Sequence, residues 1–521
     1  MITLEIPTPT FELFELLPLI IVLAGACVGI LLEALVRRSS RFFTQLLVMV
    51  ATLLGALTAL VVNWLAGAKG VFAMGSIALD GPSYIMWAAL LVFGLLALLV
   101  FGERAVDRGR SAFAPLVSAI PGSSAEQTAT DQRREHSEVF PLGLFSLLGM
   151  MVFVAASDLI TLFVALEVMS LPLYLLSGMA RRRRLLSQEA ALKYFLLGAF
   201  SSAIFLFGVA LLYGYAGAFD LGAIAIAIQA STVSRTMLLT GLVLLAVGLL
   251  FKAGVVPFQS WVPDVYTGAP TPVTGFMAIC TKLAAVGGLL RVFYVALGAE
   301  RWTWQPVLAV IAVLTMAVGV VFALTQTDIK RLLAYSAVSH AGFLLAAVVG
   351  AQAAVPAGEL NAFGSIAFYL VAYGFATIAA FAIVTLVRDK DGEATAISSW
   401  SGLATKNPLV AGVFAFLLLS FAGVPLTGGF IGKWSVFASA WTGGYAWLAV
   451  TGIGFSLVAA YFYLRVIVAM FFREPAPDVQ VGHPSLLTWL PVAVGALASL
   501  ALGLLPGPLM ELISSAEVFL R

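Results

Sequence analysis

Long apolar runs, separated by short polar connections, repeat along almost the whole chain. A membrane-spanning helix needs about 20 predominantly apolar residues, and runs of this kind predict about fourteen spans. The runs begin near Phe14, Phe43, Ser83, Pro141, Leu159, Ala190, Met237, Pro272, Trp304, Ile329, Ala362, Pro408, Tyr445 and Leu486. The pattern therefore predicts an all-α polytopic membrane protein without a separate soluble domain.

Composition agrees with this pattern. The 521 residues are 61% hydrophobic and 10% charged, with a mean hydropathy of +1.05, which is too apolar for a soluble core. The net charge of +2 indicates nothing about partners. Cys27 and Cys280 lie in different apolar runs, so we expect small buried hydrophobic side chains rather than a disulfide, a zinc site or an iron–sulfur site. No positive charge precedes the first run, which argues against a cleavable signal peptide.

Lysine and arginine are distributed unevenly between the two sets of connections. Cytoplasmic connections of membrane proteins carry the excess of these residues. Most of them follow odd-numbered spans, among them Arg37, Arg38, Arg104, Arg181 to Arg184, Lys330, Arg388 and Arg473. Those expected outside are Lys69, Arg235, Arg301 and Arg521. We therefore expect an even number of spans, with both termini on the outer, periplasmic side of a bacterial plasma membrane.

Three charged segments at the expected cytoplasmic side have simple interpretations. The Glu103–Val139 connection mixes arginines with acids, serine, proline and glycine, which predicts a solvated, partly disordered loop without the main activity. The run Arg181 to Arg184 is interpreted as a topology anchor rather than a lipid or nucleic-acid site. Glu33 is expected to pair with nearby Arg37 at the end of the first span.

The seventh span is interrupted next to a buried charge. Lys252 lies inside the apolar run, and Pro257 and Pro263 follow it. Each proline lacks the N–H that would bond the carbonyl four residues earlier, so a continuous helix is not expected. In hydrocarbon the freed carbonyls need protein or water as partners. This combination favours an ion site over the alternative, a kinked structural helix whose lysine snorkels to the surface.

The twelfth span repeats this combination. Pro425, Gly428 and Gly429 interrupt it, and Lys433 follows. Two interrupted spans, five apart, predict a pair of inverted five-helix repeats with a transport site. The expected units are a three-helix lead-in with its loop (1–139), the first repeat (140–300), the second repeat (301–473) and a final helix with its tail (474–521).

Other ionisable side chains also lie within apolar runs. Glu167 is near the middle of the fifth span, where an acid costs at least about 2.5–3.5 kcal/mol and should face a partner. Lys193 can pair with Glu189 one turn away. Lys282 is central in the eighth span. Arg291, nearer the outer end of that span, is expected to snorkel to the surface.

Two further observations bear on proton handling. His340 is the one histidine within a predicted span, and a hydrogen-bonded packing role and a proton-carrying role fit it equally well. Four of the eight lysines lie within spans, whereas arginine supplies most of the charge in the connections. Lysine can release its proton when buried and arginine cannot. This asymmetry favours proton handling over static ion pairing.

Three motifs, PFQSWVPDVYTGAPTPVTGF, LAYSAVSHAGF and GVPLTGGFIGKW, resemble the antiporter-like membrane subunits of respiratory complex I. The PDVYTGAPTPVT form is similar to the N-type branch of that family in bacterial NADH-quinone oxidoreductase, which is homologous to mitochondrial and chloroplast subunit 2. The resemblance covers about residues 141 to 472. Gln259 departs from the histidine that relatives often carry in PFH, which weakens any proposal for a titrating group there.

The resemblance implies a function and a set of site residues. It implies a proton-translocating subunit that couples quinone reduction by NADH to proton pumping, with no redox chemistry in this chain. FMN and iron–sulfur clusters would belong to other subunits, quinone would be the substrate of the complex, and neither a cofactor nor a metal would bind here. The partners would be an adjacent antiporter-like subunit, small membrane subunits and lipid, not nucleic acid. The implied relay residues are Glu167, Lys193, Lys252, Lys282, His340 and Lys433.

The implied pair of Glu167 and Lys252 fits a switch. The cost of burying a charge and the attraction of an opposite charge about 4 Å away are both of the order of 4 kcal/mol. Because these effects nearly balance, opening the pair would let Lys252 pass a proton on to Lys282. A subunit of a Mrp-type cation/proton antiporter or of a membrane-bound hydrogenase stays an alternative, as does a standalone secondary transporter that binds a substrate at its broken helices.

Overall fold

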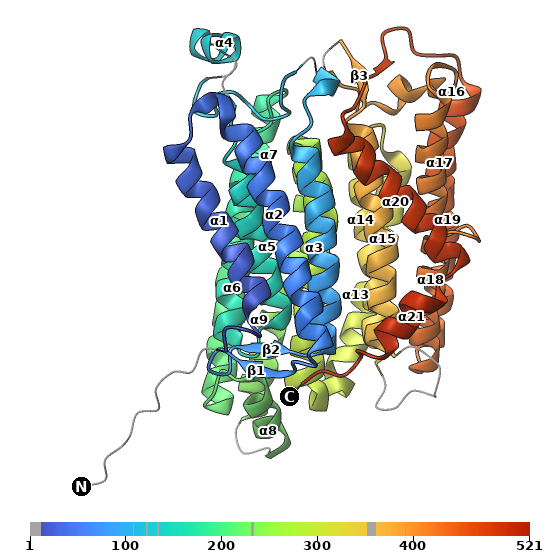
Figure 1. Ribbon diagram of the computed structural model, residues 1–521. Helices are drawn as coiled ribbons and strands as arrows, with labels where there is room; N and C mark the ends of the chain where they lie inside the picture. Colours follow the sequence, from blue (N-terminus) through green and yellow to red (C-terminus); the bar gives the residue numbers. More distant parts are fainter. Residues whose placement is uncertain are drawn as a thin grey trace.

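The computed structural model describes residues 12–107, 109–120, 123–132, 135–230, 234–351, 361–390 and 392–520. These residues form a bundle of long, roughly parallel helices (Figure 1). Twelve helices of the described chain are long and apolar enough to cross a membrane. The other two predicted spans correspond to α5 (Val139–Ala155) and to α17 (Pro408–Ala422), which α18 (Gly428–Thr442) continues. The all-α polytopic fold is confirmed.

Apolar sequence and end caps explain where these helices form. Asp80, Asp158 and Asp328 each accept a hydrogen bond from the backbone N–H three residues ahead and so cap α3, α6 and α14. The remaining helices up to α12 are α1 (Leu17–Leu35), α2 (Arg38–Leu65), α3 (Gly81–Phe101), α4 (Ser124–Asp131), α6 (Leu159–Ser177), α7 (Arg184–Ala216), α8 (Leu221–Ala230), α9 (Arg235–Ala253), α10 (Trp261–Gly268), α11 (Thr271–Phe276) and α12 (Lys282–Leu290). Those after α12 are α13 (Arg301–Thr325), α14 (Ile329–Val349), α15 (Ala362–Val384), α16 (Leu403–Lys406), α19 (Ala446–Phe472), α20 (Leu486–Leu504) and α21 (Gly507–Ser514).

Short strands and helical turns close the two ends of the bundle. An antiparallel hairpin at one end pairs β1 (Gly70–Phe72) with β2 (Ile77–Leu79) in the register Gly70 to Leu79. At the other end β3 lies between β4 and β5, and both pairings are antiparallel. The bounds are β3 (Val387–Asp389), β4 (Gly392–Glu393) and β5 (Gln480–Val481), with the 3-10 turns η1 (Ala105–Asp107), η4 (Gly298–Glu300) and η5 (Ile397–Trp400) and the π-helical turns η2 (Met277–Thr281) and η3 (Arg291–Ala296).

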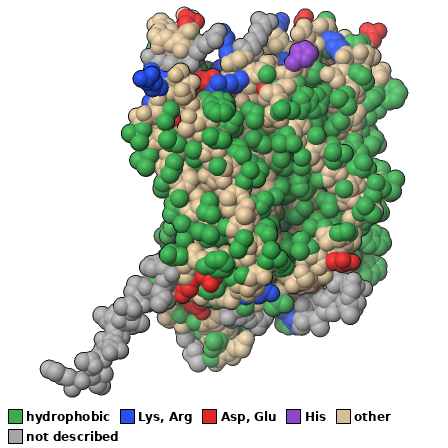
Figure 2. Space-filling model, viewed as in Figure 1, with side chains coloured by type: hydrophobic (Ala, Val, Ile, Leu, Met, Phe, Trp, Pro, Cys, Tyr) green, Lys and Arg blue, Asp and Glu red, His purple; other side chains and the backbone are tan. Residues whose placement is uncertain are grey.

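Four of the spans lie at the centre of the bundle. The most apolar window of the span Thr271–Ala296 is 100% buried, and α3, α14 and α15 are nearly as enclosed. Green apolar side chains cover the outer wall between two rims that carry the charged residues (Figure 2). The start of α1 and the end of the chain lie at the β1–β2 end, opposite the end with α4, β3 and α16 (Figure 1). The first and last described residues thus lie at the same end of the bundle, whereas residues 1–11 and Arg521 lie outside the described part.

Two expectations about residues of the first span are wrong. Glu33 pairs with Arg41 at 3.6 Å and accepts a bond from Gln45, because α2 folds back on α1 and brings those residues to it instead of Arg37. Cys27 is exposed on the outer wall, whereas Cys280 is buried as expected. An outer wall that faces hydrocarbon is as apolar as a core, so hydropathy alone does not separate the two positions.

The long connection after α3 is more ordered than its composition predicts. Asp107 forms ion pairs with Arg181, Arg182 and Arg388, and Glu126 of α4 pairs with Arg184 at 2.8 Å. Arg184 is 5% exposed and also donates to two backbone carbonyls of this connection. The arginine run is therefore not simply a solvated anchor. Residues 108, 121–122 and 133–134 of the connection lie outside the described part.

Arg291 does not snorkel to the surface. It forms a two-pronged ion pair with Asp80, at 2.5 and 2.9 Å, and both side chains are 1% exposed. Ser83 accepts a further bond at 2.7 Å. The backbone N–H of Leu520 donates to Asp80 at 2.9 Å, so the C-terminal tail covers the pair. Bidentate geometry with further hydrogen bonds is what makes a buried ion pair tolerable.

We expect Arg291→Met to destabilise the folded protein by about 3–5 kcal/mol, because it leaves the buried Asp80 carboxylate without its cation. The matched control is Arg235→Met, which breaks an exposed pair with Glu300 worth at most about 1 kcal/mol. The measurement is the heat-induced loss of assembled protein in membranes of each variant. Equal stability of Arg291→Met and Arg235→Met would contradict the expectation.

Candidate functional site

The seventh span breaks directly after Lys252. Helix α9 ends at Ala253, and Gly254 follows in the left-handed conformation with φ +72°. Its N–H caps the carbonyls of Leu250 and Phe251, and the indole of Trp261 also donates to Phe251 at 3.0 Å. Helix α10 then begins at Trp261. The predicted break is confirmed at this span.

The twelfth span has the same design in the opposite direction. Helix α17 ends at Ala422, and Gly423 caps it with φ +84°. Helix α18 begins at Gly428 after Pro425. A Cβ on Gly429 would collide with the carbonyl oxygen of Ser420, so this glycine permits the close return of α18 onto α17. The discontinuity of this span is confirmed as well.

The positions of the breaks differ from the expected ones in two respects. Pro263 lies inside the first turn of α10, where its missing N–H is not needed, and Gly428 and Gly429 are the first residues of α18. Neither feature breaks a helix. The residues that end the first half-helices are Gly254 and Gly423, which sequence reasoning missed. A glycine shortly before a proline is a common helix C-cap signal, so GVVP and GVP carried the information.

The buried ammonium of Lys252 is held by hydroxyl groups. Its Nζ donates to Ser170 Oγ at 2.7 Å and to Tyr194 OH at 3.1 Å, and it is 4% exposed. Glu167, one turn before Ser170 on α6, is near enough to act on Lys252 through its charge but forms no ion pair with it. Glu167 Oε1 is buried without a hydrogen-bond partner among the described residues. The switch pair expected from the sequence is therefore open in this structure.

Lys193 lies at the edge of the bundle rather than in its centre. Its ammonium is 2.7 Å from Glu189, which confirms the predicted pair, and 2.8 Å from Asp264. Asp264 also binds Arg331 at 2.9 Å. This carboxylate, unnoticed in the sequence, joins α7, α10 and α14. It therefore ties the second half of the broken seventh span to its neighbours on both sides.

Lys282 occupies the centre of the bundle. It directly follows the π-helical turn η2, a feature often found at functional sites. Its Nζ donates to the carbonyl of Ala337 on α14 and lies 5.0 Å from the centre of the Tyr373 ring. A cavity of about 10 Å³ is lined by both Lys252 and Lys282. A cavity of this size has room for about one water molecule.

His340 lies among aromatic side chains on the far side of Lys282. Its Nδ1 meets the hydroxyl of Tyr369, and its Nε2 is 3.2 Å from the hydroxyl of Tyr463. Tyr463 also meets Ser336. A second cavity of about 10 Å³ touches His340 and reaches Ser420 and Gly429 at the break of the twelfth span. His340 is thus held by hydrogen bonds and also borders a cavity, and its role as a packing residue or a proton carrier stays a prediction.

Lys433 lies beside the second break. Its Nζ donates to the carbonyl of Ala422, the last residue of α17, at 2.9 Å and to Ser456 Oγ at 2.7 Å. A positive charge at a helix C-terminus is favourable because the freed carbonyls are partly negative. Lys433 and Ser456 also border an open, mostly apolar groove of about 700 Å³ between α18 and α19. Lys433 therefore has space on one side.

The predicted residues, apart from Lys193, form a line through the interior. Lys252 lies within reach of the charge of Glu167 and shares a small cavity with Lys282. The charges of Lys282 and Lys433 both act on His340, which borders a second small cavity. Among the described residues, no three His, Cys, Asp or Glu side chains gather as metal ligands do. The arrangement suits a charge moving between buried sites in steps, with tyrosine or serine hydroxyls in contact with Lys252, His340 and Lys433.

Comparison with known proteins places this arrangement in a family. Residues 156–459 match the family model described as "NADH:quinone oxidoreductase/Mrp antiporter, TM". NADH-quinone oxidoreductase subunit N of Cutibacterium acnes is 51% identical over 99% of this chain and 97% of its own length. The subunit of that name from Rhodococcus opacus is also 51% identical, over 99% and 98%.

Solved structures agree with the sequence relatives. A chain of respiratory complex I from Thermus thermophilus superposes with a TM-score of 0.75 at 32% identity, over 96% of this chain and all of that one. A chain of the Mrp complex from a Dietzia species has a TM-score of 0.79 at 23% identity, over 97% of each, which indicates a shared fold. The chain belongs to the subunit N family of NADH-quinone oxidoreductase, the antiporter-like, proton-translocating membrane subunits of that respiratory complex.

Proposed function

We propose that protons cross this subunit by a relay through Glu167, Lys252, Lys282, His340 and Lys433, with Lys193 at its edge. The observation that carries the proposal is the small cavity shared by Lys252 and Lys282. Neither lysine has a carboxylate in ion-pair contact within the described chain, and each is held only by neutral oxygens. A water in that cavity would connect the two amines.

The open arrangement of Glu167 and Lys252 supports a switch. When Glu167 is near, it favours the charged lysine, and when it is withdrawn, burial favours loss of the proton. Ser170 and Tyr194 can each accept a hydrogen bond from the ammonium or donate one to the neutral amine. Small movements of α6 against α9 would then change the occupancy of the first site and drive a proton towards Lys282.

The test is to measure proton translocation and quinone-linked turnover separately in complexes with Glu167→Gln or Lys433→Arg. Loss of pumping in assembled complex is expected for both. Full pumping by both variants would contradict the relay.

The relay is proposed to act within two inverted repeats, 140–300 and 301–473, with 1–139 as a lead-in and 474–521 as a final helix and tail. Five crossings separate the broken spans, so α9–α10 and α17–α18 run in opposite directions. A water path could then reach the centre from one side of the membrane through one repeat and leave through the other. The subunit N relatives and the distant Mrp fold are compatible with this scheme, and the 51% identity to subunit N favours the respiratory complex.

We also propose the surroundings of the chain, which membership of the family supports. The subunit works within the complex I assembly in a bacterial plasma membrane, beside another antiporter-like subunit and small membrane subunits. We place FMN and the iron–sulfur clusters in other subunits and quinone at a site outside this chain. The arginine-rich end with α4 and β3 is proposed to face the cytoplasm, since positive charge is retained there.

A reporter fused after Arg521 tests this orientation. We expect a periplasm-dependent enzyme to be active at that position and a cytoplasm-dependent reporter to be inactive. Fusions in the connection after α4, near Gln132, serve as the control because they lie at the opposite end and should give the reverse pattern. The orientation is wrong if the fusion after Arg521 is active only in the cytoplasm.

A further inference from the structure

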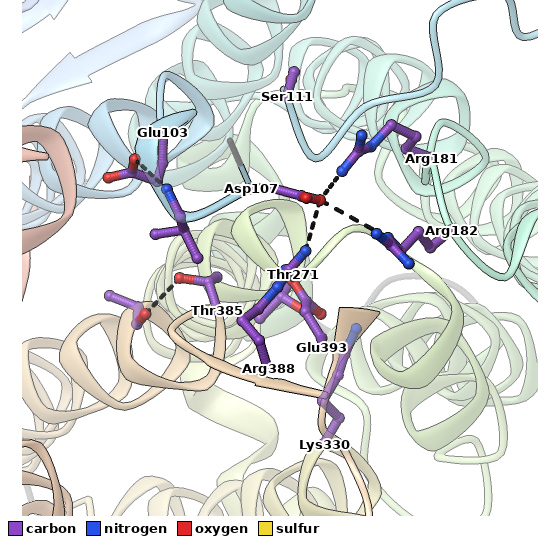
Figure 3. A network of polar contacts seen from close by, with 12 residues as sticks. Glu103, Asp107, Ser111, Arg181, Arg182, Thr271, Lys330, Thr385, Arg388 and Glu393 are labelled. Atoms are coloured by element: carbon purple, nitrogen blue, oxygen red, sulfur yellow. Dashed lines mark hydrogen bonds and ion pairs between the residues drawn. The ribbon is translucent and has the colours of Figure 1, made fainter. Parts of the chain in front are cut away.

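The arginine-rich end of the bundle contains a polar pocket that the relay does not use. Its volume is about 80 Å³. Its walls come from the connection after α3, the α6–α7 turn, the α10–α11 connection, the start of α14 and the β3–β4 hairpin, which are far apart in sequence (Figure 3). A volume of this size accommodates several water-sized groups. The pocket is therefore large enough for a small polyatomic ion.

Cationic side chains outnumber acids in this pocket. The acids Glu103, Asp107 and Glu393 face six cations, namely Arg110, Arg181, Arg182, Arg183, Lys330 and Arg388. Figure 3 shows Arg181, Arg182 and Arg388 directed at the one carboxylate of Asp107. Burial and the charges of Arg182 and Arg388 lower the pKa of Arg181 to about 10. The positive charges in the pocket thus repel one another without full compensation.

Three of the cations have no ion pair with a described carboxylate. Arg183 donates to Thr395 Oγ1 at 2.9 Å, and Arg183 and Arg110 are both exposed at the rim. Lys330 is 3% exposed, and its Nζ donates to the Ala269 carbonyl at 2.8 Å. An ammonium has three N–H donors, so two donors of this buried lysine are unused. A buried charge in that condition is costly unless something else satisfies it.

The backbone also directs the arginine run towards the pocket. Arg183 has a left-handed conformation, with φ +53°, at the residue before α7. Such a conformation is strained for a residue with a Cβ, and strained residues tend to cluster at functional sites. A topology anchor needs positive charges at this end of the bundle, but it does not need them to converge on one cavity.

We propose that this pocket binds a phosphate group. A tetrahedral oxyanion presents several acceptor oxygens, which match the two free donors of Lys330, the guanidinium of Arg183 and the hydroxyl groups on the pocket wall. Its charge would relieve the excess of positive charge. A proton entrance is the alternative use of such a pocket. It would carry an excess of acids, because an excess of positive charge lowers the local concentration of protons. The phosphate belongs either to the headgroup of an anionic phospholipid or to a soluble ion, and both satisfy the same donors.

The test uses the whole detergent-solubilised, delipidated complex. Binding of radiolabelled inorganic phosphate is measured by equilibrium dialysis at constant ionic strength, with chloride as the replaced anion. Lys330→Met and Arg183→Gln are each expected to weaken one phosphate site about tenfold or more, because each removes a charge-assisted hydrogen bond. Arg38→Gln is the matched control, since it removes an exposed arginine from the same end but outside the pocket. Arg183→Gln keeps the test decisive if Lys330→Met fails to assemble.

The source of the phosphate is tested by reconstitution. The complex is placed in vesicles of phosphatidylcholine alone or in vesicles that also contain phosphatidylglycerol. Displacement of the labelled phosphate only by phosphatidylglycerol identifies a lipid headgroup, and retention in both identifies a soluble ion. Equal phosphate binding by the wild type, Lys330→Met and Arg183→Gln would overturn the proposal, as would an equal loss in Arg38→Gln.

Discussion

Glu167→Gln is expected to reduce proton pumping about tenfold or more while the complex still assembles. The amide keeps the shape of the side chain but removes its charge. An opposite charge about 8 Å from an ammonium stabilises it by the order of 2 kcal/mol at an effective dielectric near 20, and about 1.4 kcal/mol is a tenfold change in proton occupancy. Because Glu167 Oε1 has no described hydrogen-bond partner, the substitution breaks no observed hydrogen bond at that atom. Assembly should therefore survive.

The measurement is the rate of proton uptake by membrane vesicles during NADH oxidation, divided by the amount of assembled complex. Glu511→Gln is the control, because it removes an exposed carboxylate of α21 that has no ion pair in the described structure. Its pumping should equal that of the wild type. Wild-type pumping by well-assembled Glu167→Gln complex would remove this residue from the relay.

Local sequence signals predicted the spans and both breaks. Apolar run length determines whether a segment crosses the membrane, and proline determines where a helix cannot continue, so both properties can be recognised without tertiary structure. The exact residue at which the first half-helices end depended on Gly254 and Gly423, whose left-handed conformation follows from the turn that each must make. The family motifs added the site residues, but not their contacts.

Contacts between distant segments could not be predicted from the sequence. Asp80 and Arg291 are 211 residues apart, and only the packing of α3 against the eighth span joins them. For the same reason, nothing in the sequence around Asp264 indicated that it binds two cations. Nor could the shared contact of Arg181 and Arg388 with the carboxylate of Asp107 be predicted. Position along a span also gave the wrong environment for Arg291, because snorkelling is only one of the ways in which a membrane arginine is stabilised.

Lys433→Arg is expected to lose pumping nearly as completely as Lys433→Ala. Arginine keeps a positive charge beside the carboxyl end of α17, but its guanidinium does not release a proton in proteins. A purely electrostatic role at Ala422 and Ser456 would survive the change. A relay role would not, because the site could no longer alternate between charged and neutral forms.

The groove beside Lys433 makes this comparison informative. Towards Gly423 the lysine is tightly packed, since a Cβ on that glycine would lie 2.9 Å from Lys433 Cδ. On the other side the groove of about 700 Å³ offers space for the larger guanidinium. Arginine can therefore be accommodated, and a loss of pumping reports on proton release rather than on size.

Lys406→Arg is the matched control, because that lysine binds backbone carbonyls at the exposed end and has no place in the relay. Proton translocation in vesicles, normalised to assembled complex, should be normal for Lys406→Arg and nearly absent for Lys433→Arg. Near-normal pumping by Lys433→Arg would leave Lys433 as a fixed charge that stabilises the break.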